Sequence, residues 1–231
     1  MKPTMFQCMV TTICPISLRP MFDGLCRNEQ IVHVHARAPG SLGQSVRDIG
    51  GDWKIGSLDI KVCVFDLYVY SVFVFQNGKI KISGGSRDFI ETSSHDYDDW
   101  LKTRVIEPIL TTLNLVNQET SYEYRLNLLN GSFTLPPLLM NMANYTFVCE
   151  RIGKGLKDPR FESFESLVLP SRLIMPKKRG RICSMSLKYK KGTLRFDHGG
   201  KVQLFAFKSL DDMGAATTLL VTLLETVNSN V

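Results

Sequence analysis

Two pairs of matching segments indicate that the chain contains an internal repeat. The pattern apolar, Ser or Thr, Leu, any residue, Pro, apolar occurs at residues 16–21 (ISLRPM) and again 117 positions later at residues 133–138 (FTLPPL). Residues 72–82 (VFVFQNGKIKI) and 193–204 (TLRFDHGGKVQL) both alternate apolar residues around a glycine turn, and their Gly-Lys pairs stand 122 positions apart. Each of these segments predicts a β-hairpin. Two features that recur in the same order at similar spacing predict a duplicated unit.

A long amphipathic helix is predicted after each hairpin. Residues 96–115 and 209–227 have apolar residues at the three- and four-residue spacing of a helix with one buried face. Ser209 stands at an N-cap position, and two aspartates follow it at the positive end of the helix dipole. The order strand, Pro-marked turn or helix, strands, hairpin and long helix therefore occurs twice.

This order divides the chain into two α+β units. We expect the first unit to span residues 4–116 and the second residues 122–231, with a linker at 117–121. Residues 28–56 and 144–178 lack a regular apolar pattern, so they are interpreted as loops inserted in the two units.

The composition is that of a basic globular protein. Of 231 residues, 44% are hydrophobic and 22% charged, which supplies enough apolar material for a packed core. The formal charge of +6 fits a polyanion-binding surface without requiring one. The six cysteines form no C-x-x-C pair, so neither a disulfide framework nor a zinc site is expected. No signal peptide or membrane-spanning stretch is recognisable, which predicts a soluble intracellular protein without a membrane partner.

The sequence contains few candidates for catalysis. His33 and His35 share one strand face and could ligate a metal, but no acidic or cysteine partner stands at ligand spacing. The acidic residues around Asp96 fit the N-terminus of a helix. Neither a Gly-rich phosphate loop nor a nucleophile elbow is present. We therefore expect no enzyme activity, no metal, no cofactor and no small-molecule substrate.

The two hairpins resemble those of the TATA-binding protein family. Each half of that family ends in an apolar strand, the phrase Phe-x-x-Gly-Lys, another strand and a long helix. Residues 75–79 (FQNGK) match the phrase directly, and residues 196–201 (FDHGGK) match it with one extra residue. The first strand of each family repeat carries Gln-Asn, of which this chain has Gln7 in one half and Asn127 in the other. The resemblance covers nearly the whole chain. It implies an α+β, pseudo-twofold saddle of two repeats, with a curved antiparallel sheet and helices on its convex face.

Strand alternation predicts which side chains lie on the face opposite the helices. The helices must cover the aliphatic side of the sheet, which carries Ile80 and Ile82 in the first half and Val202 and Leu204 in the second. The residues predicted on the opposite face are Phe73, Phe75, Lys81, Ser83, Gln203, Phe205 and Phe207.

The resemblance implies a transcription initiation factor that binds promoter duplex DNA in the minor groove through its concave sheet. It implies general transcription factors and a multisubunit RNA polymerase as further partners. Phe75 and Phe196 would be wedges between base steps, and cations would meet phosphates. The other DNA-binding residues that it implies are Phe73, Phe205, Lys79, Lys81, Ser83, Lys201, Gln203, Lys208, Arg195, Asn127 and Val10.

The chain also departs from the family pattern. The second phenylalanine of each repeat is missing near Leu58 and Arg179, and larger or polar residues replace the small groove-lining ones. These differences predict weak TATA preference and reduced DNA bending. They are typical of a specialised paralogue or a copy carried by a large DNA virus, which predicts a nuclear location or, for a virus, a cytoplasmic factory or virion.

Two other functions remain open at this point. The chain could be a protein-interaction subunit of a transcription complex that buries its concave face against a partner. It could also be an accessory domain of a nucleic-acid enzyme.

Overall fold

The computed structural model describes residues 2–37, 55–86, 94–115, 121–136, 139, 152–166, 184–197 and 199–229. The chain forms two compact units. We call Met5–Glu91 with His95–Asn127 the first half, and Met1–Thr4, Thr92–Ser94 and Leu128–Val231 the second half. The predicted linker lies outside the described residues except for Ser121, and so does Arg179.

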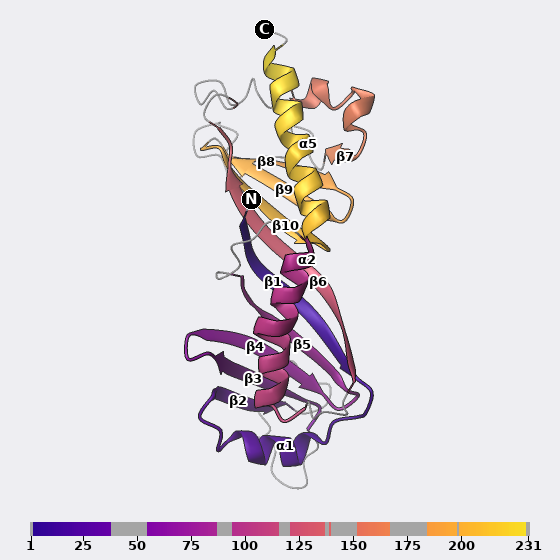
Figure 1. The fold of residues 1–231 in the computed structure, drawn as a ribbon. Helices are drawn as coiled ribbons and strands as arrows, with labels where there is room; N and C mark the ends of the chain where they lie inside the picture. Colours follow the sequence, from indigo (N-terminus) through magenta and orange to yellow (C-terminus); the bar gives the residue numbers. More distant parts are fainter. Residues whose placement is uncertain are drawn as a thin grey trace. The chain divides into compact units, whose positions relative to one another are not determined.

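The first half is an antiparallel sheet with a long helix on one face (Figure 1). Its strand order is β2-β3-β4-β5-β1. The strands are β1 (Lys2–Thr12), β2 (Ile31–Arg37), β3 (Ser57–Val64), β4 (Tyr68–Phe75) and β5 (Lys79–Gly85). The helices are α1 (Leu18–Leu25), α2 (Ser94–Trp100), the π-helical turn Leu101–Ile106 and α3 (Glu107–Thr112).

The second half repeats this order of elements. Its strands run β6-β10-β9-β8-β7, again antiparallel, with a long helix, α5, on one face (Figure 1). The elements are β6 (Tyr122–Thr134), the short 3-10 helix Pro159–Phe161, β7 (Phe164–Ser166), β8 (Ser184–Tyr189), β9 (Gly192–Asp197), β10 (Lys201–Phe207) and α5 (Leu210–Ser229). Both predicted hairpins, β4–β5 and β9–β10, and the α+β class are confirmed.

The hairpins keep the 122-residue spacing of the sequence. Gly78 and Gly200 occupy the same place in the two turns, with φ angles of 81° and 72°. Glycine adopts such angles without the steric penalty of a side chain. Beyond the turns, Val74 pairs with Ile80 in the first hairpin, as Phe196 pairs with Val202 in the second.

The other sequence match, at 117 residues, does not correspond to equivalent positions. Val10 pairs with Ile80 on β5, and Phe133 pairs with Val202 on β10, so Phe133 is the equivalent of Val10. Residues 16–21, by contrast, lead into α1. The interpretation of this motif as a repeated element is therefore wrong.

The predicted loops also contain regular structure. The segment 28–56 includes β2, which pairs with β3 at the edge of the first sheet. The segment 144–178 includes a helical turn at 152–155, the 3-10 helix and β7. Because β2 and β7 each pair with a single neighbouring strand, they carry weak apolar patterns.

The first long helix changes its winding at the centre. In the π-helical turn, the N–H of Glu107 donates to the carbonyl of Lys102, five positions earlier. Pro108 follows, and in a regular α-helix its ring would clash with the carbonyl of residue 104. The wider π turn relieves this clash. The helix still buries a continuous apolar stripe on the sheet: Leu101, Val105, Ile106, Ile109, Leu110 and Leu113.

A polar contact secures the start of this helix. The hydroxyls of Ser86 and Tyr97 lie 3.0 Å apart, and both residues are buried. Burial raises the pKa of Tyr97 above its usual range, while the hydrogen bond with Ser86 opposes the rise. The phenol therefore stays protonated and satisfies the buried serine.

The second long helix has the predicted cap. The Oγ of Ser209 accepts a hydrogen bond of 3.1 Å from the N–H of Asp212. Asp211 and Asp212 lie in the first turn, and the helix is buried along its apolar stripe. None of the described helices is long and apolar enough to cross a lipid bilayer.

Candidate nucleic-acid interface

The sheet of each half has one face without a long helix, which we call the open face. In the first half the buried side chains alternate with half-buried or exposed ones along β1, β3, β4 and β5, as a sheet covered on one side requires. The side chains on the open face are Met5, Gln7, Met9, Thr11, His33, His35, Arg37, Ser57, Asp59, Lys61, Cys63, Val69, Ser71, Phe73, Phe75, Lys79, Lys81 and Ser83.

Phe73 lies at the centre of this face between two cations. Its ring centroid is 5.4 Å from the guanidinium carbon of Arg37 and 5.8 Å from the Nζ of Lys81. Both distances are within the range of cation–π attraction. Arg37 also forms an ion pair of 2.5 Å with Asp59, which pairs with Phe73 across β3 and β4. The aromatic ring is thus held in place from both sides.

The open face of the first half is positively charged. Among the residues that the structure describes, its ionised side chains are four cations and one carboxylate: Arg37, Lys61, Lys79, Lys81 and Asp59. The buried Nε of Arg37 has no hydrogen-bond partner among the described residues. A buried donor without a partner is costly.

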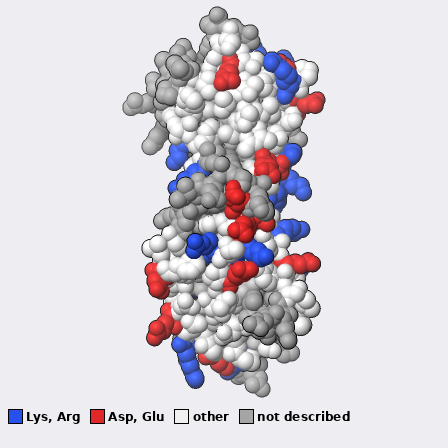
Figure 2. Space-filling view, viewed as in Figure 1, with Lys and Arg blue, Asp and Glu red and all other residues white. Residues whose placement is uncertain are grey.

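The opposite side differs in its charge pattern. Figure 2 shows the side that carries the helices, where Asp and Glu are mixed with Lys and Arg. The excess of cations over carboxylates on the open face is therefore a local feature.

In the second half the open face is more polar. Lys201 and Gln203 are exposed, and Phe205 is 36% exposed. Arg195 pairs with Gln203, which pairs in turn with Ser132. Further side chains on this face are Asn130, Thr134, Ser186, Lys188 and Thr193.

Two residues that the sequence assigned to DNA lie in the core. Val10 and Phe196 are fully buried on the helix-covered faces, so their assignment is wrong. The two turns have the same length, because Val74 pairs with Ile80 and Phe196 pairs with Val202, so Asp197, not Phe196, stands at the position of Phe75. A shift of one residue along a strand moves a side chain to the other face.

Phe207 is also buried, contrary to the alternation of β10. The strand has an irregularity between Leu204 and Phe207, where Ala206 adopts a φ of 60°. The N–H of Ala206 donates to the Oδ1 of Asn130 on β6 over 3.0 Å. This bulge turns Phe207 to the covered face while Phe205 stays on the open one.

The remaining predicted residues lie in different surroundings. Asn127 is half-buried on β6 and its Oδ1 accepts from the Nε of Arg125 over 3.3 Å. Lys208 is exposed directly after β10. The structure therefore brings Phe73, Phe75, Lys79, Lys81 and Ser83 onto one face, and Arg195, Lys201, Gln203 and Phe205 onto the other open face.

Sequence reasoning missed two lysines at equivalent positions and one arginine. Lys61 pairs with Ser71 in the first half, and Lys188 pairs with Thr193 in the second. The Nζ of Lys61 donates a hydrogen bond to the Oγ of Ser71. Alternation along β3 and β8 could have found both lysines, whereas Arg37 was lost because its strand was interpreted as a loop.

The two histidines share the open face, as expected. The rings of His33 and His35 stack with centroids 6.2 Å apart and an interplanar angle of 10°. Among the residues that the structure describes, no group of three or more His, Cys, Asp or Glu is placed to hold a metal ion.

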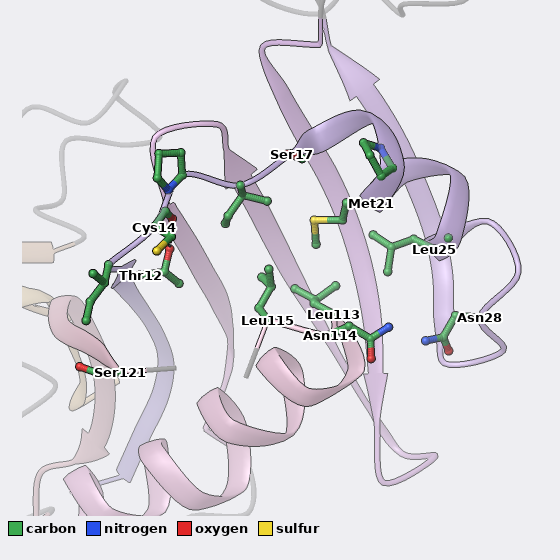
Figure 3. Close-up of a pocket in the computed structure, with 15 residues that line it drawn as sticks. Thr12, Cys14, Ser17, Met21, Leu25, Asn28, Leu113, Asn114, Leu115 and Ser121 are labelled. Atoms are coloured by element: carbon green, nitrogen blue, oxygen red, sulfur yellow. Dashed lines mark hydrogen bonds between the residues drawn. The ribbon is translucent and has the colours of Figure 1, made fainter. Parts of the chain in front are cut away.

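A separate pocket of about 700 Å³ lies beside α1 in the first half (Figure 3). Met21 and Leu25 of α1 face Leu113 and Leu115 at the end of the long helix, and Cys14 closes one side. None of the residues that line it carries a charge. The pocket suits an apolar group and has no acid or base for catalysis.

The two halves define an α+β fold in which one unit, an antiparallel sheet covered by a long helix, occurs twice. The fold is that of Methanococcus jannaschii TBP, a solved structure that matches with a TM-score of 0.51 over 97% of this chain and 98% of that chain. The two sequences are 12% identical, so the likeness concerns the fold alone. No protein-family model matches the chain, and no curated protein matches it in sequence.

Proposed function

We propose that the protein binds duplex DNA in the minor groove through its open faces and acts as a transcription initiation factor. The observation that carries the proposal is the first-half open face, where Phe73 lies between Arg37 and Lys81 among four cations and one carboxylate. Charge complementarity favours a polyanion on this face.

Each kind of side chain on this face has a role on DNA. Lysines that meet phosphates release counterions, which makes affinity fall as salt rises. Aromatic rings partly unstack base steps from the minor groove, and hydroxyl or amide groups such as Ser83 and Gln7 bond to base edges. A sheet face is wide enough to cover the shallow minor groove of a bent duplex.

The fold supports a role in initiation rather than in catalysis. The likeness to a TBP favours general transcription factors and a multisubunit RNA polymerase as partners, docked on the helices. A nuclear or viral-factory location is a further part of the proposal that rests on the sequence. The role needs neither a metal nor a cofactor, and it involves no membrane or small-molecule substrate.

A salt titration of duplex binding tests the proposal. The double variant Lys79→Ala/Lys81→Ala should lower the slope of log affinity against log salt by about two units, one for each phosphate contact. Lys102→Ala is the matched control, because Lys102 is an exposed cation on the long helix; it should leave the slope unchanged. Equal slopes in all three proteins, or no duplex binding at any salt, would contradict the proposal.

The apolar pocket beside α1 favours a second candidate function, a protein-interaction subunit of a transcription complex. Its uncharged lining fits an apolar side chain of a partner protein. If this function is correct, the parent protein should assemble with purified general transcription factors but should not bind duplex DNA. The variant Met21→Arg should abolish this assembly. Assembly that tolerates Met21→Arg would exclude this role of the pocket.

A further inference from the structure

The strand registers allow the open faces of the two halves to be compared position by position. Phe73 pairs with Lys81 in the first hairpin, and Arg195 pairs with Gln203 at the same place in the second. The next position outward on the strand, towards the turn, is Phe75 in the first half and Asp197 in the second. Both aromatic positions of the first hairpin are therefore polar in the second.

The aromatic residue that does lie on the second open face has a different place. Phe205 pairs with Thr193 and occupies the position of Ser83, next to the bulge at Ala206. No cation–π contact to Phe205 occurs among the described residues, whereas Arg37 and Lys81 flank Phe73. Cations beside a wedge can neutralise the phosphates around an opened base step, so the first half is better suited to opening one.

The second half is better suited to an unopened groove. A row of side chains crosses its sheet through Ser186, Arg195, Gln203 and Ser132. Arginine side chains are attracted to the narrow minor groove of A-tracts, where the negative potential is enhanced. Serine and glutamine supply donors for the A·T acceptors at the floor of that groove.

We propose that the two halves act differently on DNA: the first opens one base step with Phe73 and Phe75, and the second holds an unopened A-tract through Arg195. This inference rests on the proposed DNA-binding function. The first half then prefers a flexible pyrimidine–purine step, and the second half prefers a stiff A-tract. The protein therefore kinks the duplex at one place, the flexible step.

The experiment uses the full chain and duplexes with a TA step beside an A-tract, with 2-aminopurine at successive steps to report unstacking. The parent should raise fluorescence at one step only. Phe73→Ala/Phe75→Ala should abolish this rise while keeping the salt slope, which also shows that the variant is folded. Phe205→Ala is the matched aromatic control and should retain the rise.

A second variant tests the role of Arg195. Arg195→Ala should weaken binding to the A-tract duplex about tenfold more than binding to a duplex with a G·C tract. Arg195→Lys keeps the charge and should restore affinity but only part of the preference.

The outcomes of these experiments distinguish this inference from the proposed DNA-binding function on which it rests. Unstacking at two steps, loss of unstacking in Phe205→Ala alone, or equal weakening of both duplexes by Arg195→Ala would overturn the asymmetry while DNA binding stands. Failure of the parent to bind any duplex would overturn both.

Discussion

The β4–β5 and β9–β10 hairpins share the same turn position and pairing register but have different open faces. Their turns share a glycine with positive φ, and their covered faces are apolar in both. On the open face, Phe73 and Lys81 of the first hairpin become Arg195 and Gln203 in the second. The covered face is constrained by packing against a helix, whereas no long helix packs on the open face, so its side chains can diverge more freely.

The covered faces also differ in sequence, but the differences compensate each other in packing. In the first half the ring of Tyr70 lies over Gly84, and in the second the ring of Phe207 lies over Gly192. Tyr70 and Gly192 stand 122 positions apart and are equivalent, so the aromatic residue and the glycine have exchanged strands. The two halves fill the same space from opposite strands.

The largest difference between the hairpins should appear when their phenylalanines are truncated. Phe196→Ala should lower the free energy of unfolding by about 3–5 kcal/mol because it empties a fully buried site. Phe75→Ala, on the open face, should cost about 1 kcal/mol or less. Chemical denaturation measures both. A larger loss for Phe75→Ala would mean that the faces are assigned the wrong way round.

The exchanged aromatic–glycine pairs should respond alike to an added methyl group. A Cβ at Gly84 would lie 2.3 Å from the Tyr70 ring, and one at Gly192 would lie 2.6 Å from the Phe207 ring. Gly84→Ala and Gly192→Ala should each cost about 1–3 kcal/mol through overpacking. Gly214→Ala in α5 meets nothing within 4 Å and should be neutral or stabilising. If only one of the two glycines tolerates alanine, the packing is not equivalent.

Alanine variants of the serines that precede α5 and α1 should differ by about 1 kcal/mol in the free energy of unfolding that they lose. Ser209 caps α5 through its side chain, so Ser209→Ala should lower the unfolding free energy by about 1 kcal/mol. Ser17 precedes α1 without a side-chain cap bond, so Ser17→Ala should change it little. Thermal unfolding of the two variants distinguishes them, and equal losses would contradict the capping geometry.

The change in unfolding free energy that is smallest at neutral pH comes from a buried thiol of the first half, which acts only at alkaline pH. Burial raises the pKa of Cys8 from 9.0 to about 12, so its folded form stays protonated while the unfolded thiol ionises. The free energy of unfolding should therefore fall as pH rises from about 9 towards about 12. Cys8→Ala should reduce this decline, whereas Cys14→Ala, at an exposed site, should not. Identical alkaline profiles for the two variants would show that Cys8 does not contribute.

The sequence determined the local elements of this protein. The Asn-Gly and Gly-Gly turns, flanked by alternating apolar residues, predicted both hairpins, and the helical spacing with Ser209 predicted α5 and its cap. These features depend on residues that are neighbours in the chain, so propensity and pattern are enough to find them.

Only the tertiary structure decided on which face Phe196, Phe207 and Arg37 lie. Phe196 lies in the core because its pairing with Val202 puts it on the covered face, and strand side chains alternate with a period of two. Asn130 stabilises the bulge at Ala206 from 76 positions away and so turns Phe207 inward. Arg37 joins the open face through the pairing of β2 with β3. Each outcome depends on contacts between distant segments, which no local pattern in the sequence records.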